Sequence, residues 1–157
     1  MRIVAWIGFA VVRWRSRRGL RDGAASTPDA KKQEALQTGV RGETYAYWYL
    51  RRLGYLFIAK NYAPSHSKGE IDLIGYDRDT LVFVEVRTRA VVQGATALPE
   101  MSITREKHHV LVRTAHYFLR DRRIEDCPIR FDVLAIDNRP DQPPLVRLHQ
   151  AALSPVA

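Results

Sequence analysis

The stretch that most constrains the fold runs from Gly69 to Arg89 and reads GEIDLIGYDRDTLVFVEVRTR. It holds two apolar runs in which alternate residues share a character, separated by the polar residues 77–79. Alternation interrupted by a short polar segment is typical of a β-hairpin. A turn centred between Arg78 and Asp79 gives one register, whether the loop has two or four residues. This stretch therefore predicts the strand pair around which the rest of the chain folds.

The predicted register places two carboxylates face to face. With that turn, Ile74 lies opposite Phe83. Two residues further from the turn, Asp72 lies opposite Glu85. Opposed residues have Cβ atoms about 5 Å apart, and like charges at that distance destabilise a sheet. We therefore expect a cation to compensate the pair, and Arg87 follows Glu85 on the same face of the strand.

Paired carboxylates with a fixed cation beside them suit metal-assisted chemistry. Mg²⁺ or Mn²⁺ takes oxygen ligands, and Mg²⁺ often takes only one or two carboxylates. Phosphodiester hydrolysis uses such a metal together with a cation that stabilises charge on the phosphate. An amphipathic hairpin with one solvated face is the alternative interpretation of the same residues. The apolar Phe83 beside Glu85 favours a site.

The residues of this hairpin also resemble a known nuclease signature. Asp72 and the Glu-x-Arg sequence at residues 85–87 resemble the PD-(D/E)xK motif. The strings GEIDLI, LVFVEVRTR and, upstream, GETYAYWYLRRLGY are similar to the YraN-type family of bacterial predicted endonucleases, from about Thr38 to about Leu148. This resemblance implies a restriction-endonuclease-like domain, similar in fold to archaeal Holliday-junction resolvases.

The motif departs from the superfamily pattern at its last residue. The pattern usually ends in Lys, whereas this chain has Arg87, and some members of the family resemble it in this. An arginine side chain does not lose its proton in proteins, so Arg87 cannot be a general base. It can still hold a phosphate through two parallel hydrogen bonds.

A helix predicted over Glu34–Leu53 carries a further candidate. Glu43 lies on its apolar stripe, where the resemblance implies a third metal-site carboxylate. A wet edge of the stripe, or an arginine partner, would also explain a carboxylate there. Gly39 and Gly42 lower helix stability, which indicates either a close approach to another backbone or a helix that begins near Thr38.

A second helix is predicted over residues 102–121, with Ser102 as its N-cap. Lys107 lies on the apolar stripe of this helix. Either its stem covers apolar surface while the amine reaches water, or it brings a cation toward the scissile phosphate, as the resemblance implies. Arg113 on the same helix and Arg89 at the end of the hairpin are further candidate contacts to nucleic acid.

The order of elements predicts the fold class. Further strands are predicted over residues 55–62, 129–136 and 145–148. Helix, three strands, helix and two strands together predict an α/β fold: a mixed sheet of about five strands packed by helices, of the restriction-endonuclease-like class. Asp132 is predicted to lie mid-strand with an arginine partner.

Charge and composition divide the chain unevenly. The net charge is +8, and residues 1–32 supply most of it with eight Lys or Arg and two acids. We predict a basic N-terminal extension and linker over residues 1–32, a nuclease-like domain over 33–150 and a C-terminal tail over 151–157. The single cysteine, Cys127, fits a reducing cytoplasm.

The N-terminal extension has an apolar run, residues 3–12, that is too short to cross a bilayer. Arginines follow this run instead of preceding it, unlike a secretory signal. Three interpretations stay open. The segment contacts a membrane surface or another protein, it is a poorly ordered extension, or the start codon has been assigned upstream of the true one.

The sequence predicts a metal-dependent phosphodiesterase acting on nucleic acid, a resolvase-like DNA endonuclease. Its predicted catalytic residues are Asp72, Glu85 and Arg87; its metal ligands for Mg²⁺ or Mn²⁺ are Glu43, Asp72 and Glu85; its nucleic-acid contacts are Arg87, Arg89, Lys107 and Arg113. The alternative is a non-catalytic nucleic-acid-binding or repair and recombination adaptor module that retains the nuclease fold. Junction cutting needs two sites and hence a homodimer.

Overall fold

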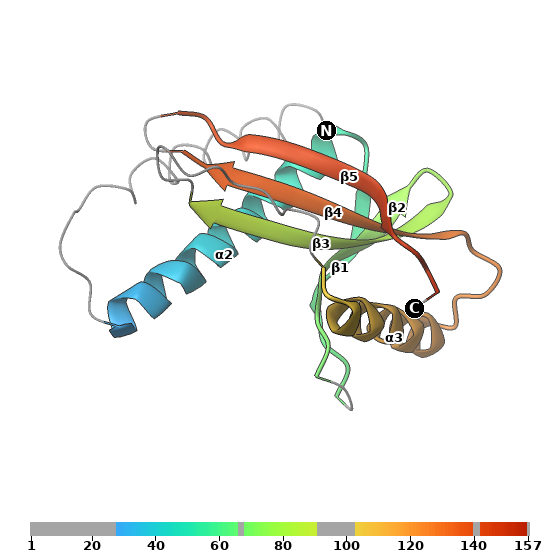
Figure 1. The fold of residues 1–157 in the computed structure, drawn as a ribbon. Helices are drawn as coiled ribbons and strands as arrows, with labels where there is room; N and C mark the ends of the chain where they lie inside the picture. Colours follow the sequence, from blue (N-terminus) through green and yellow to red (C-terminus); the bar gives the residue numbers. More distant parts are fainter. Residues whose placement is uncertain (1–27, 66–67, 91–102, 140–141, 157) are drawn as a thin grey trace.

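The computed structural model describes residues 28–65, 68–90, 103–139 and 142–156 (Figure 1). They form a five-stranded sheet with helices packed on it, and the strand order is β1-β2-β3-β4-β5. The predicted order of elements and the predicted α/β fold class are confirmed. The elements are α2 (Pro28–Arg52), β1 (Leu56–Tyr62), β2 (Ile71–Asp77), β3 (Thr80–Ala90), α3 (Arg105–Arg122), β4 (Ile129–Asn138) and β5 (Leu145–Leu153).

The sheet is mixed because one connection crosses over. β1, β2 and β3 form an antiparallel meander, and β4 pairs antiparallel with β5. β3 and β4 are parallel, and α3 lies in the connection between them. Parallel neighbours need such a crossover, because a tight turn reverses the chain direction. The crossover places α3 near the hairpin that carries the candidate residues (Figure 1).

The hairpin has the predicted register. Ile74 pairs with Phe83 and Tyr76 pairs with Leu81. The strands are joined by a two-residue turn at Arg78 and Asp79, and Arg78 has a φ of 56°. Two-residue hairpin turns favour positive φ at their central residues. The alternating pattern read from the sequence therefore sets which side chains face together.

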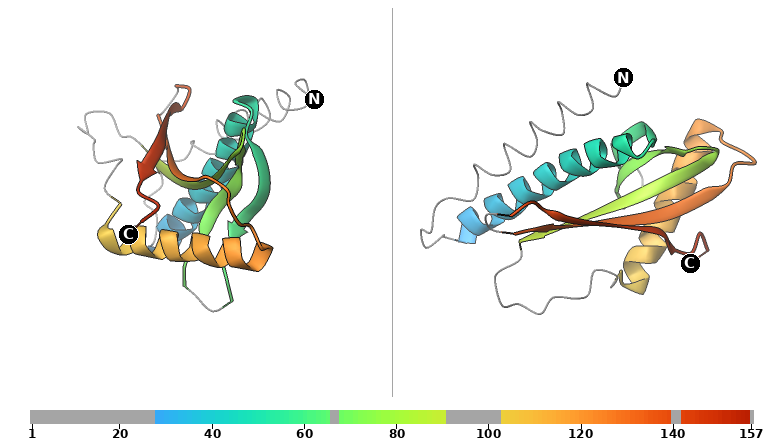
Figure 2. Two further views of the ribbon diagram at one scale, coloured as in Figure 1. Left: turned by 90° about the vertical axis from the view of Figure 1, so that its right-hand side faces the viewer. Right: turned by 90° about the horizontal axis from the view of Figure 1, so that it is seen from above.

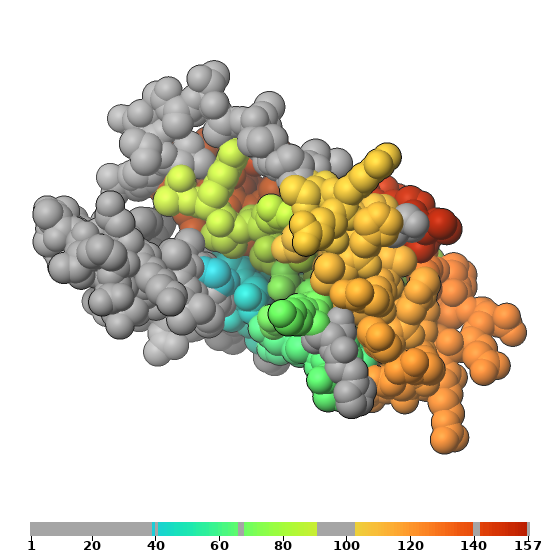
Figure 3. Space-filling model, turned by 60° about the horizontal axis from the view of Figure 1, so that its bottom comes forward, coloured from blue at the N-terminus to red at the C-terminus, as the bar shows by residue number. Residues whose placement is uncertain are grey.

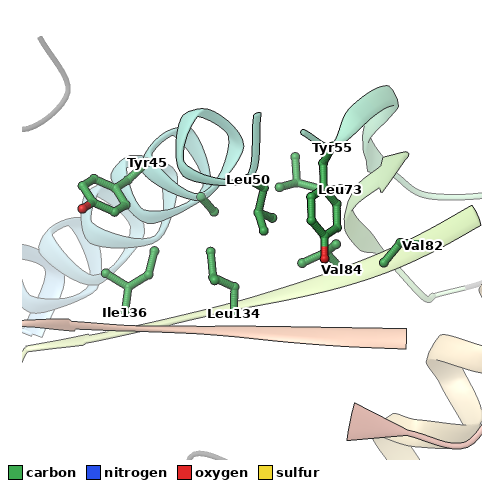
Figure 4. Close-up of a cluster of buried hydrophobic side chains, with 9 residues drawn as sticks. Tyr45, Leu50, Tyr55, Leu73, Val82, Val84, Leu134 and Ile136 are labelled. Carbon is green, nitrogen blue, oxygen red and sulfur yellow. The ribbon is translucent and has the colours of Figure 1, made fainter. Parts of the chain in front are cut away.

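The two helices cover opposite faces of the sheet, so β3 is buried on both. Val82 and Val84 pack in the cluster that includes Leu50 of α2 (Figure 4). The intervening side chains Leu81 and Phe83 pack in the cluster that includes residues of α3. Alternation along a strand produces this division. Figure 2 shows α2 and α3 running in different directions across the sheet.

Several element boundaries differ from the prediction. α2 begins at Pro28 instead of Glu34, so the end of the predicted linker is helical. Proline suits the first turn, where its missing N–H costs no hydrogen bond. α3 is capped by Thr104, whose Oγ1 accepts from the Lys107 amide at 3.2 Å. The predicted cap, Ser102, lies outside the described residues.

The last strand is longer than predicted. β5 continues to Leu153, and its residue 153 pairs with Phe131 of β4. The start of the predicted tail, residues 151–157, is therefore strand. Pairing with a long neighbouring strand supplies hydrogen bonds that local propensity does not reveal. Neither helix in the described part of the chain is long and apolar enough to cross a membrane.

The predicted arginine partner of Asp132 is Arg130. The Arg130 Nε and Nη2 atoms donate to the two Asp132 carboxylate oxygens at 2.8 and 2.9 Å. Tyr55 Oη also donates to Asp132, and Arg130 reaches Asp77 at 2.9 Å. Asp132 is buried, with 1% of its surface exposed. A buried carboxylate is tolerated when it is paired and hydrogen-bonded in this way.

Gly42 allows α2 to approach β3 closely. A Cβ atom built at Gly42 would lie 1.8 Å from Thr88 Oγ1, whereas one built at Gly39 would meet nothing within 4 Å. The expected close approach is thus confirmed for Gly42 and wrong for Gly39. The helix also begins well before Thr38. The contact matters because residue 43 follows directly and is held beside β3.

These two glycines give a matched pair of substitutions. Gly42→Ala should lower the free energy of unfolding by about 1–3 kcal/mol, because the new methyl group overpacks against Thr88. Gly39→Ala should raise it by about 0.5–1 kcal/mol through helix propensity. Urea denaturation of both variants measures the difference. A Gly42→Ala protein as stable as Gly39→Ala would contradict the close approach.

Candidate metal and phosphate site

Asp72 and Glu85 lie where β2 and β3 stop pairing. The ladder runs from the turn as far as Leu73 and Val84. One residue further along, the Asp72 Oδ2 atom accepts a hydrogen bond from the Val86 amide at 2.6 Å. A side-chain oxygen thus takes the place that a strand carbonyl would fill. Both carboxylates belong to the hairpin face that α3 covers, as the register predicts.

The environment of Asp72 favours its neutral form. Its pKa is raised to about 7, first by burial and then by the negative charge of Glu85. The Val86 hydrogen bond opposes this rise, Glu43 adds to it, and Lys107 opposes it. Like charges near a buried carboxyl raise its pKa because the charged form is repelled and poorly solvated. The site therefore holds more negative charge than its own cations neutralise.

Glu85 is the buried centre of an ion-pair group. Its side chain is 7% exposed, and its Oε1 atom forms an ion pair with the Lys107 ammonium of α3. Arg87 Nε lies 3.5 Å from the same Oε1 atom. Lys107 thus reaches into the site from the first turn of α3, as the resemblance implies. Two cations, one from α3 and one from β3, therefore lie against the Glu85 carboxylate.

Arg87 has a hydrogen-bond donor with no acceptor. Its Nε atom is buried and makes no hydrogen bond to any residue in the described part of the chain. The 3.5 Å contact with Glu85 is an ion pair and not a hydrogen bond. An unsatisfied buried donor costs free energy in the folded state. A ligand with an anionic oxygen would satisfy it.

Glu43 is held at the edge of this group by a residue that sequence reasoning missed. Its Oε2 atom accepts from Asn61 Nδ2 at 2.9 Å. Asn61 is in β1, in a register that places it beside Asp72, and has a φ of 50°. Asparagine is among the few residues that adopt this left-handed conformation readily. The polar residues near the end of this strand, Lys60 and Asn61, were the available signal.

The other two candidate residues lie apart from the carboxylate pair. Arg89 binds Asp137 through Nε and through Nη2, the latter at 3.0 Å, and Arg147 binds the same carboxylate at 2.6 Å. The arginine hydrogen bonds hold the pKa of Asp137 down at about 2. Arg89 is therefore committed to an ion pair between β3 and β4. Arg113 lies on the exposed side of α3.

The donor set fits a hard divalent cation through two carboxylates. Across the described residues, no group of three or more His, Cys, Asp or Glu side chains is arranged to hold a metal ion. Glu43, with its hydrogen bond to Asn61, is therefore outside such a group. Mg²⁺ commonly uses one or two carboxylates and completes its shell with water and phosphate. Asp72 and Glu85 match that requirement, and their excess negative charge attracts a cation.

Comparison with known proteins agrees with the fold and the hairpin motif. A model of the "Uncharacterised protein family UPF0102" matches residues 42–136, which include α2 from Gly42, the hairpin, α3 and most of β4. The chain belongs to the UPF0102 family. The resemblance to the YraN-type family is thereby confirmed.

Relatives within the family are similar over most of their length. A UPF0102 protein of Koribacter versatilis is 36% identical over 129 residues, which is 82% of this chain and 88% of that protein. One from Pseudomonas fluorescens is 43% identical over 108 residues, 68% of this chain and 87% of its own. One from Psychromonas ingrahamii is 40% identical over 112 residues, 71% and 87% of the two chains. The shared part of this UPF0102 chain contains the candidate site.

The raised pKa of Asp72 predicts how stability changes with pH. A group whose pKa is higher in the folded state than the ordinary 3.8 favours folding most below pH 3.8. That contribution is lost as the pH rises to about 7. Metal-free wild-type protein should therefore lose stability relative to Asp72→Asn between pH 4 and 7, by up to roughly 4 kcal/mol. Urea denaturation in EDTA at several pH values measures this difference.

Glu85→Gln is the matched comparison for this experiment. It also removes one carboxylate, but it leaves Lys107 without its ion-pair partner. Asp137, with a pKa of about 2, stays charged in all three proteins over this range. A constant difference between wild type and Asp72→Asn from pH 4 to 7 would contradict the buried, repelled carboxyl.

Proposed function

We propose that this UPF0102 protein is a metal-dependent phosphodiesterase acting on nucleic acid, and specifically a DNA endonuclease. One observation carries the proposal: the opened end of a hairpin brings two carboxylates together beside a buried arginine donor that has no acceptor among the described residues. Carboxylates that attract a divalent metal and a donor that attracts an anionic oxygen are complementary to a phosphodiester. Family membership is consistent with this proposal but does not specify the reaction.

Each residue has a separate role in the proposed reaction. Asp72 and Glu85 would bind Mg²⁺ or Mn²⁺, and Glu43 would bind it through water. The metal, when bound, would act as a Lewis acid on the phosphate oxygens and would supply a water molecule as the nucleophile. Arg87 would donate to the scissile phosphate and stabilise the charge that builds on it. Lys107 forms an ion pair with Glu85 and would add positive charge beside the phosphate.

Metal binding should be visible in the stability of the protein. A ligand that binds only the folded state stabilises it, by about 2.7 kcal/mol at one hundred times the dissociation constant. Mn²⁺ should therefore raise the melting temperature of the wild type. Asp72→Asn and Glu85→Gln should lose that response, and Glu43→Gln should keep part of it. Thermal unfolding in EDTA and in Mn²⁺ measures all four proteins.

Asp137 provides the negative control for this experiment, because it is a buried carboxylate that already has two arginine partners. A rise in melting temperature with Mn²⁺ that is equal in the wild type and in Asp72→Asn would place the metal elsewhere, and the proposal would fail.

A second candidate function is a nucleic-acid-binding module without catalysis. The observation that favours it is the ion pair of Glu85 with Lys107 and its contact with Arg87, since these cations already neutralise one of the two carboxylates. The absence of a three-residue metal group among the described residues points the same way. In this case Arg87 would still contact phosphate, but no bond would be broken.

Arg87 distinguishes the two functions. For an enzyme, Arg87→Ala should reduce the single-turnover rate of cleavage about 10²–10³-fold, the scale of losing one preorganised donor. Arg87→Lys should keep cleavage, because lysine also supplies a positive charge. Linear and branched DNA substrates with Mn²⁺, and with EDTA as the blank, give the rates.

The control is Arg122→Gln, which removes an equal charge from the end of α3, where its guanidinium lies 5.6 Å from the Phe118 ring. For a binding module, no protein in the series cuts any substrate, and Arg87→Ala only weakens binding. An Arg87→Ala protein that cuts as fast as the wild type would contradict the role given to this residue.

A further inference from the structure

We propose that the outer face of α3 is a binding track for the nucleic-acid backbone, extending away from the candidate site. This inference rests on the proposed function, because it assigns a substrate-binding surface to the same protein. The surface is separate from the two-carboxylate site. The track is the set of six exposed residues Arg105, His109, Arg113, His116, Arg120 and Arg123.

Helix geometry places the five of these side chains that belong to α3 in one narrow sector. At about 100° per residue, their directions span roughly 80° around the axis of α3. The buried residues Leu111, Thr114 and Phe118 point the opposite way, whereas buried Val112 borders the sector. Every position within the sector holds an arginine or a histidine. The sector extends from Arg105 to Arg120, and Arg123 follows it as the C-cap residue in the left-handed conformation.

The acidic residues of α3 lie beside the track and not within it. By the same geometry, Glu106 falls at the border of the sector, and Asp121 lies further round the helix. Asp121 accepts a hydrogen bond from Tyr62 Oη at 2.7 Å and lies 3.9 Å from Arg120. Glu125 and Asp126 follow the helix and bound the far end of the track. An ordinary solvated helix face mixes both charges, whereas this sector does not.

The track continues from the candidate site. Lys107, in the first turn of α3, reaches Glu85, so this end of the helix lies against the site. Arg120 is about 20 Å further along the axis. Figure 3 shows α3 along one face of the molecule, with residues of β3 next to its first turns. The track begins at this end of the helix and lies on the side of α3 that faces away from Lys107.

The composition of the track favours nucleic acid over a membrane. A helix that rests on a membrane keeps an apolar face free to enter the lipid. The apolar face of α3 is buried against the sheet, where Phe118 packs with Phe83. The exposed sector defined above presents arginines with histidines between them, and the acidic residues lie outside it. Such a row matches the repeating phosphates of a nucleic-acid backbone.

The test is the salt dependence of binding, measured without metal so that no cleavage occurs. A fluorescein-labelled 20-base-pair DNA duplex in EDTA is titrated at salt concentrations from 50 to 200 mM. In Arg113→Gln/Arg120→Gln, the slope of log affinity against log salt should be smaller in magnitude by about 2, since each phosphate contact contributes about 0.9. Binding to the duplex should also be weaker at every salt concentration.

The matched control is Arg51→Gln/Arg52→Gln. It removes the same charge from the last turn of α2, on the other side of the sheet. The track is supported when the α3 variant alone changes the slope. Equal changes in both variants would show a general charge effect and overturn it, as would no change in either.

Two further measurements separate the remaining outcomes. If vesicles containing anionic phosphatidylserine bind the wild type but not the α3 variant, while duplex binding is unchanged, the face is a membrane contact and the proposal is wrong. Cleavage with Mn²⁺ is assayed separately. If the slope changes in the α3 variant but the wild type cuts no substrate, the track is supported and the proposed endonuclease activity is wrong. If the wild type cuts DNA but the slope does not change, the endonuclease activity is supported and the track is wrong.

Discussion

The candidate site depends on the hydrogen bond from the Val86 amide to the Asp72 carboxylate. This bond ends the β2–β3 ladder with a side-chain oxygen, so the strands separate while Asp72 stays next to Glu85. Burial and the nearby charge raise the pKa of Asp72 to about 7. A protein tolerates such a pair when another requirement keeps it, because opposed like charges reduce stability. Cation binding is the requirement that this geometry favours.

The neighbouring elements position the rest of the site by close contact. Gly42 lets α2 pass against Thr88, which brings Glu43 toward β1, where Asn61 holds it. From the other face, α3 delivers Lys107 to Glu85. The same crossover that makes β3 and β4 parallel therefore carries both the inner cation and, on its outer side, the row of arginines and histidines. Layering two helices on one sheet thus lets one helix supply a cation to the site and present a second basic surface to solvent.

The family resemblance and the geometry of the structure both point to the hairpin, but the family gives relatedness and the geometry gives the chemical argument. Membership of UPF0102 identifies related chains and the matched region, residues 42–136. It does not name a reaction. The proposed chemistry rests on the geometry: two carboxylates, an arginine Nε that has no acceptor among the described residues, and a lysine that pairs with Glu85. The motif usually ends in lysine, and Arg87 stands at that position in this chain. Arginine still supplies a positively charged donor, but it cannot act as a general base.

The sequence by itself determined the hairpin, its register and the side-by-side carboxylates, because the period of two in residues 69–89 and the short turn leave one pairing. It also indicated the arginine partner of Asp132, whereas for Lys107 it left open whether the amine reaches water or the site. Only the tertiary structure decided which cation each acid meets. Arg89, three positions after Val86, binds Asp137 on β4 instead of the site, and Asn61 holds Glu43. These contacts join residues far apart in the chain, so no local period encodes them; they follow from how the strands and helices pack.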